Sequence, residues 1–175
     1  KDVKKILKKY KVWNKVPKKV KDHINYGEKS KELETPKKNS RIFKKTQNTL
    51  VGSNNLCLEN MNLLCKKKKM KSKVWFRNID GDVKKISKRF SDEIKKLNFK
   101  LPLLLISGGE TTVKVNGKGK GGRNQELALY FAKEMRKQNP SKKFIILSAG
   151  TDGRDGPTNA AGAILDHNSL DLIKK

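Results

Sequence analysis

Hydrophobic residues in the first part of the chain recur at helical spacing and are separated by lysines. The residues that predict an amphipathic helix over residues 1–10 are Val3, Ile6, Leu7 and Tyr10. Pro17 can open a second helix that Gly27 would stop, because proline suits the first turn of a helix and glycine its end. Residues 27–45 are polar and aperiodic, so we expect a linker or long loop there.

From residue 46 onward, short apolar runs alternate with longer segments of helical period. Short strands are predicted at 48–51 and 74–76. Helices are predicted at 54–66 and from Asp82, whose side chain can cap the second of them. The predicted buried sides of these helices are Leu56, Cys57, Met61, Leu64 and Cys65 in the first, and Val83, Ile86, Phe90, Ile94 and Leu97 in the second.

The last part of the chain has the pattern of a buried sheet. Continuous apolar runs at 101–106 and 144–147 predict strands buried on both faces. The other elements predicted are a half-buried strand at 111–115, a helix at 123–138, a strand at 160–165 and a frayed helix at 168–174. Because strands alternate with helices, we predict an α/β fold with a mainly parallel sheet flanked by helices.

The net charge is strongly positive, because 43 lysines and arginines stand against 17 acidic residues and give +26. Such a charge would suit a nucleic acid or an anionic membrane surface. Only six of the basic residues are arginines, however, and aromatic residues make up 6% of the chain. Arginine clusters and aromatic stacking platforms are therefore missing. We predict a solvated, lysine-rich surface and no specific nucleic-acid partner.

The cysteines and the apolar runs bear on the compartment. Cys57 and Cys65 fit neither metal-ligand spacing nor a disulfide framework, which indicates reduced core positions. No apolar run approaches the roughly 20 residues of a membrane helix, and no signal peptide is visible. The chain starts with Lys1 inside a predicted helix, so we interpret it as a fragment. We expect a cytoplasmic protein with no membrane partner, and leave a mitochondrial location open.

Three glycine-rich loops follow predicted strands, at 107–112, 117–126 and 149–158. Loops at the carboxyl ends of strands are where α/β sheets bind ligands. In the second loop, GKGKGGRNQE, the glycines and the start of a helix predict an anion-binding nest, to which Lys118, Lys120 and Arg123 add positive charge. The alternative is a flexible hairpin-to-helix loop with surface lysines. The loop has neither a Walker A nor a dinucleotide-binding pattern.

Carboxylates accompany the other two loops. Glu110 follows Gly108 and Gly109, where it could contact a metal or a hydroxyl group or simply fix the loop. Asp152 and Asp155 could hold Mg²⁺ or accept a proton from a hydroxyl, or could form Asx-turns. The residues by themselves therefore indicate phosphoryl transfer, or binding of a phosphorylated or carboxylated small molecule.

The same loops carry a family resemblance. SGGETTVKVNGKGKGGRNQELAL followed by SAGTDGRDGPTNAAGAILD resembles the C-terminal MOFRL domain of the glycerate 2-kinase family, and NTLVGSNNLCLE resembles the segment that precedes it. The resemblance implies phosphorylation of D-glycerate to 2-phosphoglycerate with ATP and Mg²⁺, in a cleft between two α/β domains. It implies a helical remnant and linker of the Rossmann-like N-terminal domain at 1–45, a closing α/β segment of that domain at 46–100, and a truncated MOFRL-like domain at 101–175.

The resemblance also implies residue roles. Arg123 could hold the glycerate carboxylate or the transferring phosphoryl group. Glu110 and Asp152 are implied as further catalytic residues and as candidate metal ligands. The implied substrate- or phosphate-binding residues are Gly108, Gly109, Lys120, Gly121, Gly122 and Asn124.

One part of the family pattern is missing. The family's glycine-rich turn and active-site lysine belong to an N-terminal half that has no counterpart in these residues. The chain is therefore expected to form one wall of the cleft and to be inactive by itself. The alternative is a non-catalytic remnant that binds a small molecule or a protein partner.

Overall fold

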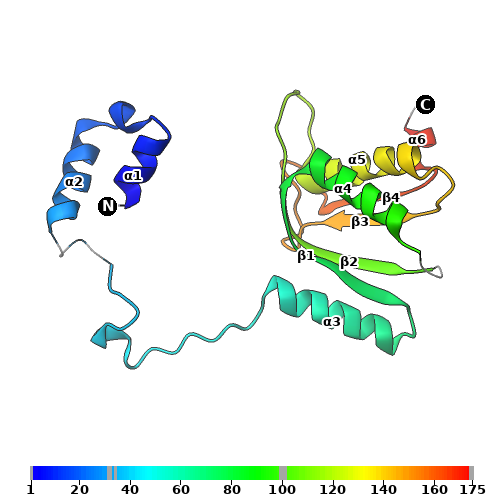
Figure 1. Ribbon diagram of the computed structural model, residues 1–175, viewed down its shortest axis with the longest axis horizontal. Helices are drawn as coiled ribbons and strands as arrows, with labels where there is room; N and C mark the ends of the chain where they lie inside the picture. Colours follow the sequence, from blue (N-terminus) through cyan, green and yellow to red (C-terminus); the bar gives the residue numbers. More distant parts are fainter. Residues whose placement is uncertain (1, 31–32, 34, 99–101, 174–175) are drawn as a thin grey trace. The chain divides into compact units, whose positions relative to one another are not determined.

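The computed structural model describes residues 2–30, 33, 35–98 and 102–173. It contains two compact units, residues 1–50 and residues 51–175 (Figure 1). The first unit is helical, and the second contains two pairs of strands and four helices among its described residues. In the described part of the chain, no helix is both long enough and apolar enough to cross a membrane.

The first unit consists of short helices, and none of its described residues is buried. Helix α1 spans Asp2–Lys9 and α2 spans Lys18–Lys29, with the 3-10 turn η1 (Trp13–Lys15) between them. Neither helix contains a buried residue. The Lys4 side chain joins them, because its Nζ donates to Asn25 Oδ1 at 2.8 Å and to Glu28 Oε2 at 2.9 Å. The two predicted amphipathic helices are confirmed, although their apolar sides stay largely exposed.

Two predictions for the region around the linker are wrong. Helix α2 continues through Gly27, because a glycine inside a helix costs only about 1 kcal/mol and does not by itself end it. The predicted strand at 48–51 is absent from the structure, where residues 46–53 have no regular form and η3 (Arg41–Phe43) precedes them. Leu50 and Val51 are exposed, and no strand in the described part of the chain pairs with them to take up their backbone hydrogen bonds.

The second unit places helices on the two faces of its strands. Its helices are α3 (Asn54–Lys67), α4 (Val83–Lys96), α5 (Arg123–Gln138) and α6 (Ser169–Leu172). Its strands are β1 (Ser72–Asp82), β2 (Leu104–Thr112), β3 (Ile145–Ala149) and β4 (Gly162–Asp166). Helix α3 packs on one side of β1 and β2, and α4 and α5 lie on the other side (Figure 1).

The strands form one parallel and one antiparallel pair. Strands β1 and β2 run parallel, from Ser72 opposite Leu104 to Asp82 opposite Thr112, with α4 as the connection that a parallel pair requires. Strands β3 and β4 are antiparallel, with Leu147 opposite Ile164. The predicted α/β class is confirmed. The strand predicted at 111–115 is the end of β2, and residues 113–115 are not part of it.

The core forms where α4 and α5 meet the strands. Asp82 caps α4 as predicted, since its Oδ1 accepts the amides of Lys84 and Lys85 at 3.0 and 3.4 Å. The large apolar residues that the two helices bury in this core are Val83, Ile86, Phe90, Leu127, Phe131 and Met135, and Trp75, Phe76 and Phe144 pack against them. Helix α5 begins at Arg123 and ends at Gln138, the two residues predicted.

Several residues that were predicted to be buried are exposed. In β3, Ile145 and Leu147 are 77% and 68% exposed, so this apolar strand is covered on one face only. In α3 the buried residue is Leu58, and the side predicted to be buried, which includes Met61 and Leu64, faces outward. Because α3 has apolar residues around most of its circumference, its period does not identify the side that meets the sheet.

Candidate functional site

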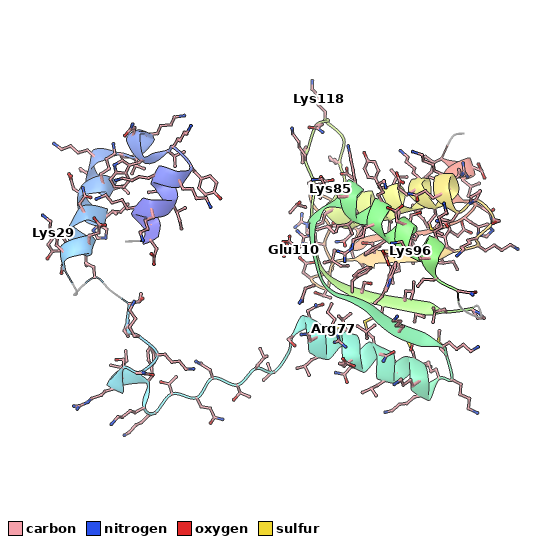
Figure 2. All side chains as sticks on the ribbon, viewed as in Figure 1. Lys29, Arg77, Lys85, Lys96, Glu110 and Lys118 are labelled. Atoms are coloured by element: carbon pink, nitrogen blue, oxygen red, sulfur yellow. The ribbon has the colours of Figure 1, made fainter. Side chains whose placement is uncertain are left out.

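The residues that the resemblance implies as a site come from three segments: the end of β2, the loop before α5 and the loop after β3. Figure 2 shows Glu110 at the edge of the β1–β2 pair, and Lys118 at the tip of the loop that leads from β2 to α5. This loop stands out from the sheet, and residues 114–121 are exposed. A side chain added at Gly119 or Gly121 would meet no atom within 4 Å. Lys120 therefore lies on an open loop, as the hairpin-to-helix alternative predicted, and not in a closed nest.

Arg123, the first residue of α5, lies beside Glu110. The distance from Arg123 Nη1 to Glu110 Oε1 is 3.1 Å, and the two side chains are 42% and 72% exposed. The structure thus brings together two of the three implied catalytic residues. An exposed ion pair contributes little stability, so an anionic ligand could replace Glu110 at low cost. The guanidinium has five N–H donors, which leaves donors for a carboxylate or phosphate while Glu110 remains in place.

The start of α5 is occupied by a carboxylate from within the chain. Asp155 is 2% exposed. Its Oδ1 accepts from the backbone N–H of Asn124 at 3.0 Å and its Oδ2 from that of Gln125 at 2.9 Å. The side-chain amides of the same two residues donate to the same oxygens at 3.1 and 3.2 Å. The anion-binding amides predicted for this helix start therefore already hold an anion, and that anion is Asp155.

The side chain of Asn124, the residue after Arg123, forms two further hydrogen bonds within the chain. Ser148 Oγ on β3 donates to Asn124 Oδ1 at 2.9 Å. Asn124 Nδ2 also donates to Asp155 Oδ1, so the Asn124 side chain joins the start of α5 to both β3 and the loop that follows it. Asn124 was implied as a substrate-binding residue. In the structure its side chain is occupied by these contacts within the chain.

The glycines next to Arg123 make room for this arrangement. A Cβ atom at Gly122 would overlap the Asp155 carboxylate. Gly156, at φ +59°, has its Cα against the carbonyl of Gly121, so a Cβ there would overlap that oxygen. Gly122 and Gly156 thus allow the loop after β3 to approach the start of α5.

The glycines of the SGGETT loop have a similar explanation. The side chain of Asn54, at the start of α3, lies over Gly108, and the backbone of Ile79 lies over Gly109, which has φ +143°. Asn54 Nδ2 also donates to the carbonyl of Arg77. In the structure α3 and β1 approach these two glycines closely, and their role in binding a substrate stays a prediction. Asn54 is a residue that sequence reasoning missed, although VGSN carried part of the resemblance.

The carboxylates of this region do not assemble a metal site. Among the described residues, no group of three or more His, Cys, Asp or Glu side chains is placed to hold a metal ion. Asp152 Oδ1 accepts the amide of Arg154 at 3.2 Å, which is the Asx-turn that was its alternative reading. Glu110 pairs with Arg123. These residues do not fit Mg²⁺ as a complete ligand set, and the metal assignment of Glu110 and Asp152 stays a prediction.

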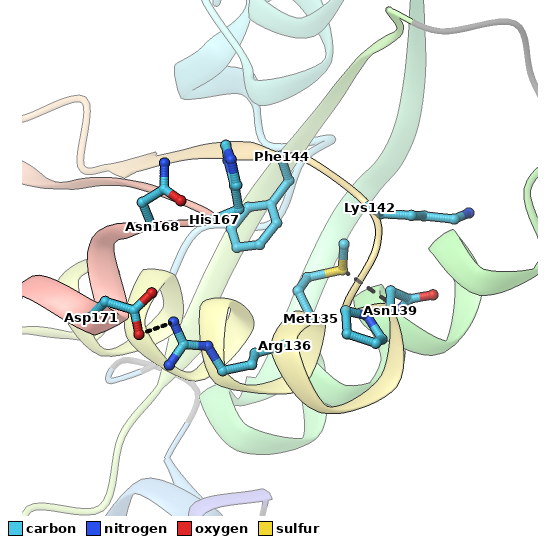
Figure 3. A pocket seen from close by; sticks show the side chains of 9 residues that line it. Met135, Arg136, Asn139, Lys142, Phe144, His167, Asn168 and Asp171 are labelled. Atoms are coloured by element: carbon cyan, nitrogen blue, oxygen red, sulfur yellow. Dashed lines mark hydrogen bonds and ion pairs between the residues drawn. The ribbon is translucent and has the colours of Figure 1, made fainter.

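A cavity of about 320 Å³ lies at the opposite end of α5 (Figure 3). It is lined by Met135, Arg136, Asn139, Pro140, Lys142, Phe144, His167, Asn168 and Asp171. Arg136 Nη2 pairs with Asp171 Oδ1 at 2.9 Å, and Lys142 Nζ donates to the carbonyl of Ile94 at 2.9 Å. At 1.5 Å per residue, this end of the helix is about 20 Å from Arg123. The cavity is therefore separate from the candidate site.

The environment of Asp155 predicts a dependence of stability on pH. Burial raises the pKa of Asp155, but the donors from Gln125 and Asn124 outweigh burial and hold its pKa below the ordinary value. A lowered pKa contributes stability that is complete above the unfolded-state pKa, at about 4, and is lost as the pH falls through the lower folded-state pKa. We expect Asp155→Asn to lose less stability than the wild type between about pH 5 and pH 2, in urea unfolding. Parallel curves for the two proteins would contradict this.

Known proteins are similar to this chain in both sequence and fold. Residues 103–175 match the MOFRL family. The glycerate 2-kinase of Pyrococcus horikoshii is 33% identical over 99% of the chain, and the chain covers 39% of that protein. A glycerate kinase of Danio rerio is 55% identical over 35% of the chain and 12% of its own length. The crystal structure of glycerate kinase from Thermotoga maritima superposes with a TM-score of 0.71 at 34% identity, over 97% of this chain and 38% of that one. The chain thus spans about two fifths of the length of these two prokaryotic relatives.

Proposed function

Since residues 103–175 match the MOFRL family and nearly the whole chain aligns with glycerate kinases, we propose that this polypeptide is part of a glycerate 2-kinase. In that enzyme ATP would phosphorylate the 2-hydroxyl of D-glycerate to give 2-phosphoglycerate. The observation that carries the proposal is the position of Arg123. Arg123 is the first residue of α5, and its side chain is partly exposed. Its guanidinium lies at the end of β2 against the Glu110 carboxylate, which an anionic ligand could replace.

The chemistry of the reaction suits this arginine. D-glycerate offers a carboxylate, and the planar fork of an arginine can bind a carboxylate through two parallel hydrogen bonds. Phosphoryl transfer concentrates negative charge on the transferring group, and catalysis is mostly positioning and charge stabilisation. Arg123 can serve either purpose. Glu110 would hold the guanidinium in place until the substrate anion arrives.

ATP and Mg²⁺ are proposed as cofactors of the complete enzyme. Bound Mg²⁺ would neutralise charge on the ATP phosphates. Lys118 and Lys120, on the open loop before α5, add positive charge near the site. The backbone amides of Asn124 and Gln125 cannot bind the ATP phosphates at the same time, because they already donate to Asp155.

We also propose that the chain supplies one wall of the active-site cleft. It spans 39% of the Pyrococcus relative. Two surfaces of the second unit are apolar and exposed, the outer side of α3 and the face of the β3–β4 pair that carries Ile145, Leu147 and Ile164. Faces of this kind are typical of surfaces that another part of a protein covers. The remaining part of the enzyme is the partner that fits them.

The proposal predicts that the chain alone does not turn over substrate. We expect no ATP- and Mg²⁺-dependent phosphorylation of D-glycerate by the isolated chain, because it supplies part of the cleft. A chimera in which it replaces the matching part of the Thermotoga maritima enzyme should be active. Turnover by the isolated chain would contradict the one-wall proposal. A folded chimera that binds D-glycerate without phosphorylating it would favour a binding remnant.

A further inference from the structure

We propose that Asp155 is a positioning residue for Arg123, and that the site therefore holds an anionic substrate group through the Arg123 guanidinium and not through the amides at the start of α5. The inference rests on the proposed function for the identity of the substrate. The placement of the carboxylate that carries it is independent of that function.

The start of α5 has no local cap. A helix leaves its first N–H groups without partners inside the helix, and a side chain at the N-cap usually accepts one of them. Here the N-cap is Gly122, which has no side chain. Asp155 comes from 31 residues further along the chain and accepts two of these N–H groups, one on each carboxylate oxygen. A negative charge is also favourable at this end of the helix.

The carboxylate of Asp155 has no open position for a ligand. Each of its oxygens accepts one backbone and one side-chain N–H, from Asn124 and from Gln125. Gln125 Nε2 also donates to Thr158 Oγ1 at 3.1 Å, and Thr158 Oγ1 donates to the Asp155 carbonyl at 2.7 Å. Gly122 closes the remaining side. Metal binding or proton transfer at Asp155 would require these bonds to break, so the arrangement assigns it a positioning role.

Arg123 is the residue that this arrangement places. It lies between Gly122, which packs against Asp155, and Asn124, which is bonded to Asp155 twice. Its backbone is therefore held from both sides, and its side chain extends outward to Glu110. Asp155 already neutralises the positive end of α5. The group that remains to donate directed hydrogen bonds to a bound anion is therefore the Arg123 guanidinium.

The test uses the whole 175-residue chain and inorganic phosphate as the probe. In ¹H–¹⁵N spectra of the wild type, phosphate should shift the Arg123 Nε–Hε signal and leave the backbone amides of Asn124 and Gln125 unchanged. Arg123→Ala should lose the binding. Larger shifts at the Asn124 and Gln125 amides than at Arg123, or no response of Arg123, would overturn the inference. This measurement does not depend on any variant of Asp155.

The variant Asp155→Asn gives a second test through the sign of its effect. It removes a negative charge beside the site, so simple electrostatics would make phosphate bind more tightly. If Asp155 positions Arg123, phosphate should instead bind several-fold more weakly, while the rest of the spectrum shows that the protein is still folded. Tighter binding with movement of the Asn124 and Gln125 amides would show that the helix start is the anion site. Failure of the chimera to phosphorylate D-glycerate would count against the proposed function and leave both phosphate results unaffected.

Discussion

Replacing Arg123 by alanine should abolish measurable phosphorylation of D-glycerate by an active chimera that contains this chain. We expect kcat/KM to fall about 10³-fold or more, the range measured when an arginine that stabilises a transferring phosphoryl group is removed. The structure gives the reason, since Arg123 extends a partly exposed guanidinium from the start of α5 and its partner Glu110 is more exposed still. The measurement is steady-state kinetics with varied D-glycerate and with varied ATP.

The helix offers a matched control for this prediction. Arg136 lies near the other end of α5, forms a similar exposed ion pair with Asp171 at 2.9 Å, and is about 20 Å away. Arg136→Ala should keep kcat/KM within a few-fold of the parent. Near-normal kinetics for Arg123→Ala, or equal losses in the two variants, would refute the assignment of Arg123. Arg123→Lys should recover only part of the activity, because lysine keeps the charge and loses the fork.

Replacing Gly122 by alanine should destabilise the second unit by about 2–4 kcal/mol, the cost of an overpacked contact together with disturbed hydrogen bonds to a buried carboxylate. The backbone of Gly122 is extended, at φ −147° and ψ 174°, so alanine is allowed there as far as the dihedral angles are concerned. The penalty comes from its Cβ, which would overlap the Asp155 carboxylate. Urea unfolding followed by Trp75 fluorescence, in a Trp13→Phe background, reports on this unit.

Gly119 provides the comparison for Gly122. It lies in the same loop, and an added Cβ would meet no atom within 4 Å. Alanine there should be neutral or stabilising by up to about 1 kcal/mol, because it reduces the freedom of the unfolded chain. If the two alanine variants were equally stable, the close packing of Gly122 on Asp155 would be wrong.

Elements with a single apolar side were predictable from the sequence. Helix α5 begins at Arg123 and ends at Gln138 as predicted, and Asp82 caps α4 as its place before an apolar period indicated. Helix α3 was predicted as an element but not in its orientation, since its leucines, its cysteines and Met61 occur on several sides. A local period reports which residues can be buried, and tertiary packing decides which of them are.

The sequence indicated which loops form the candidate site, but not which hydrogen bonds and ion pairs its residues make. The resemblance pointed to Arg123 and Glu110, and the structure places them 3.1 Å apart. No local pattern could show that Asp155 would fill the start of α5, because the two lie 31 residues apart and their contact depends on how the strands bring the loops together. The Asx-turn alternative suited Asp152 and not Asp155, although both precede a glycine.

The long separation between Asp155 and the start of α5 also sets an order of events during synthesis. A ribosome completes the helical segment that ends at Gln138 well before it adds Asp155 and Thr158. Until those residues emerge, the amides of Asn124 and Gln125 have no carboxylate to accept them, and the first turn of α5 must remain solvated or frayed. The arginine therefore reaches its final position only after the strand β3 and the loop beyond it have been translated.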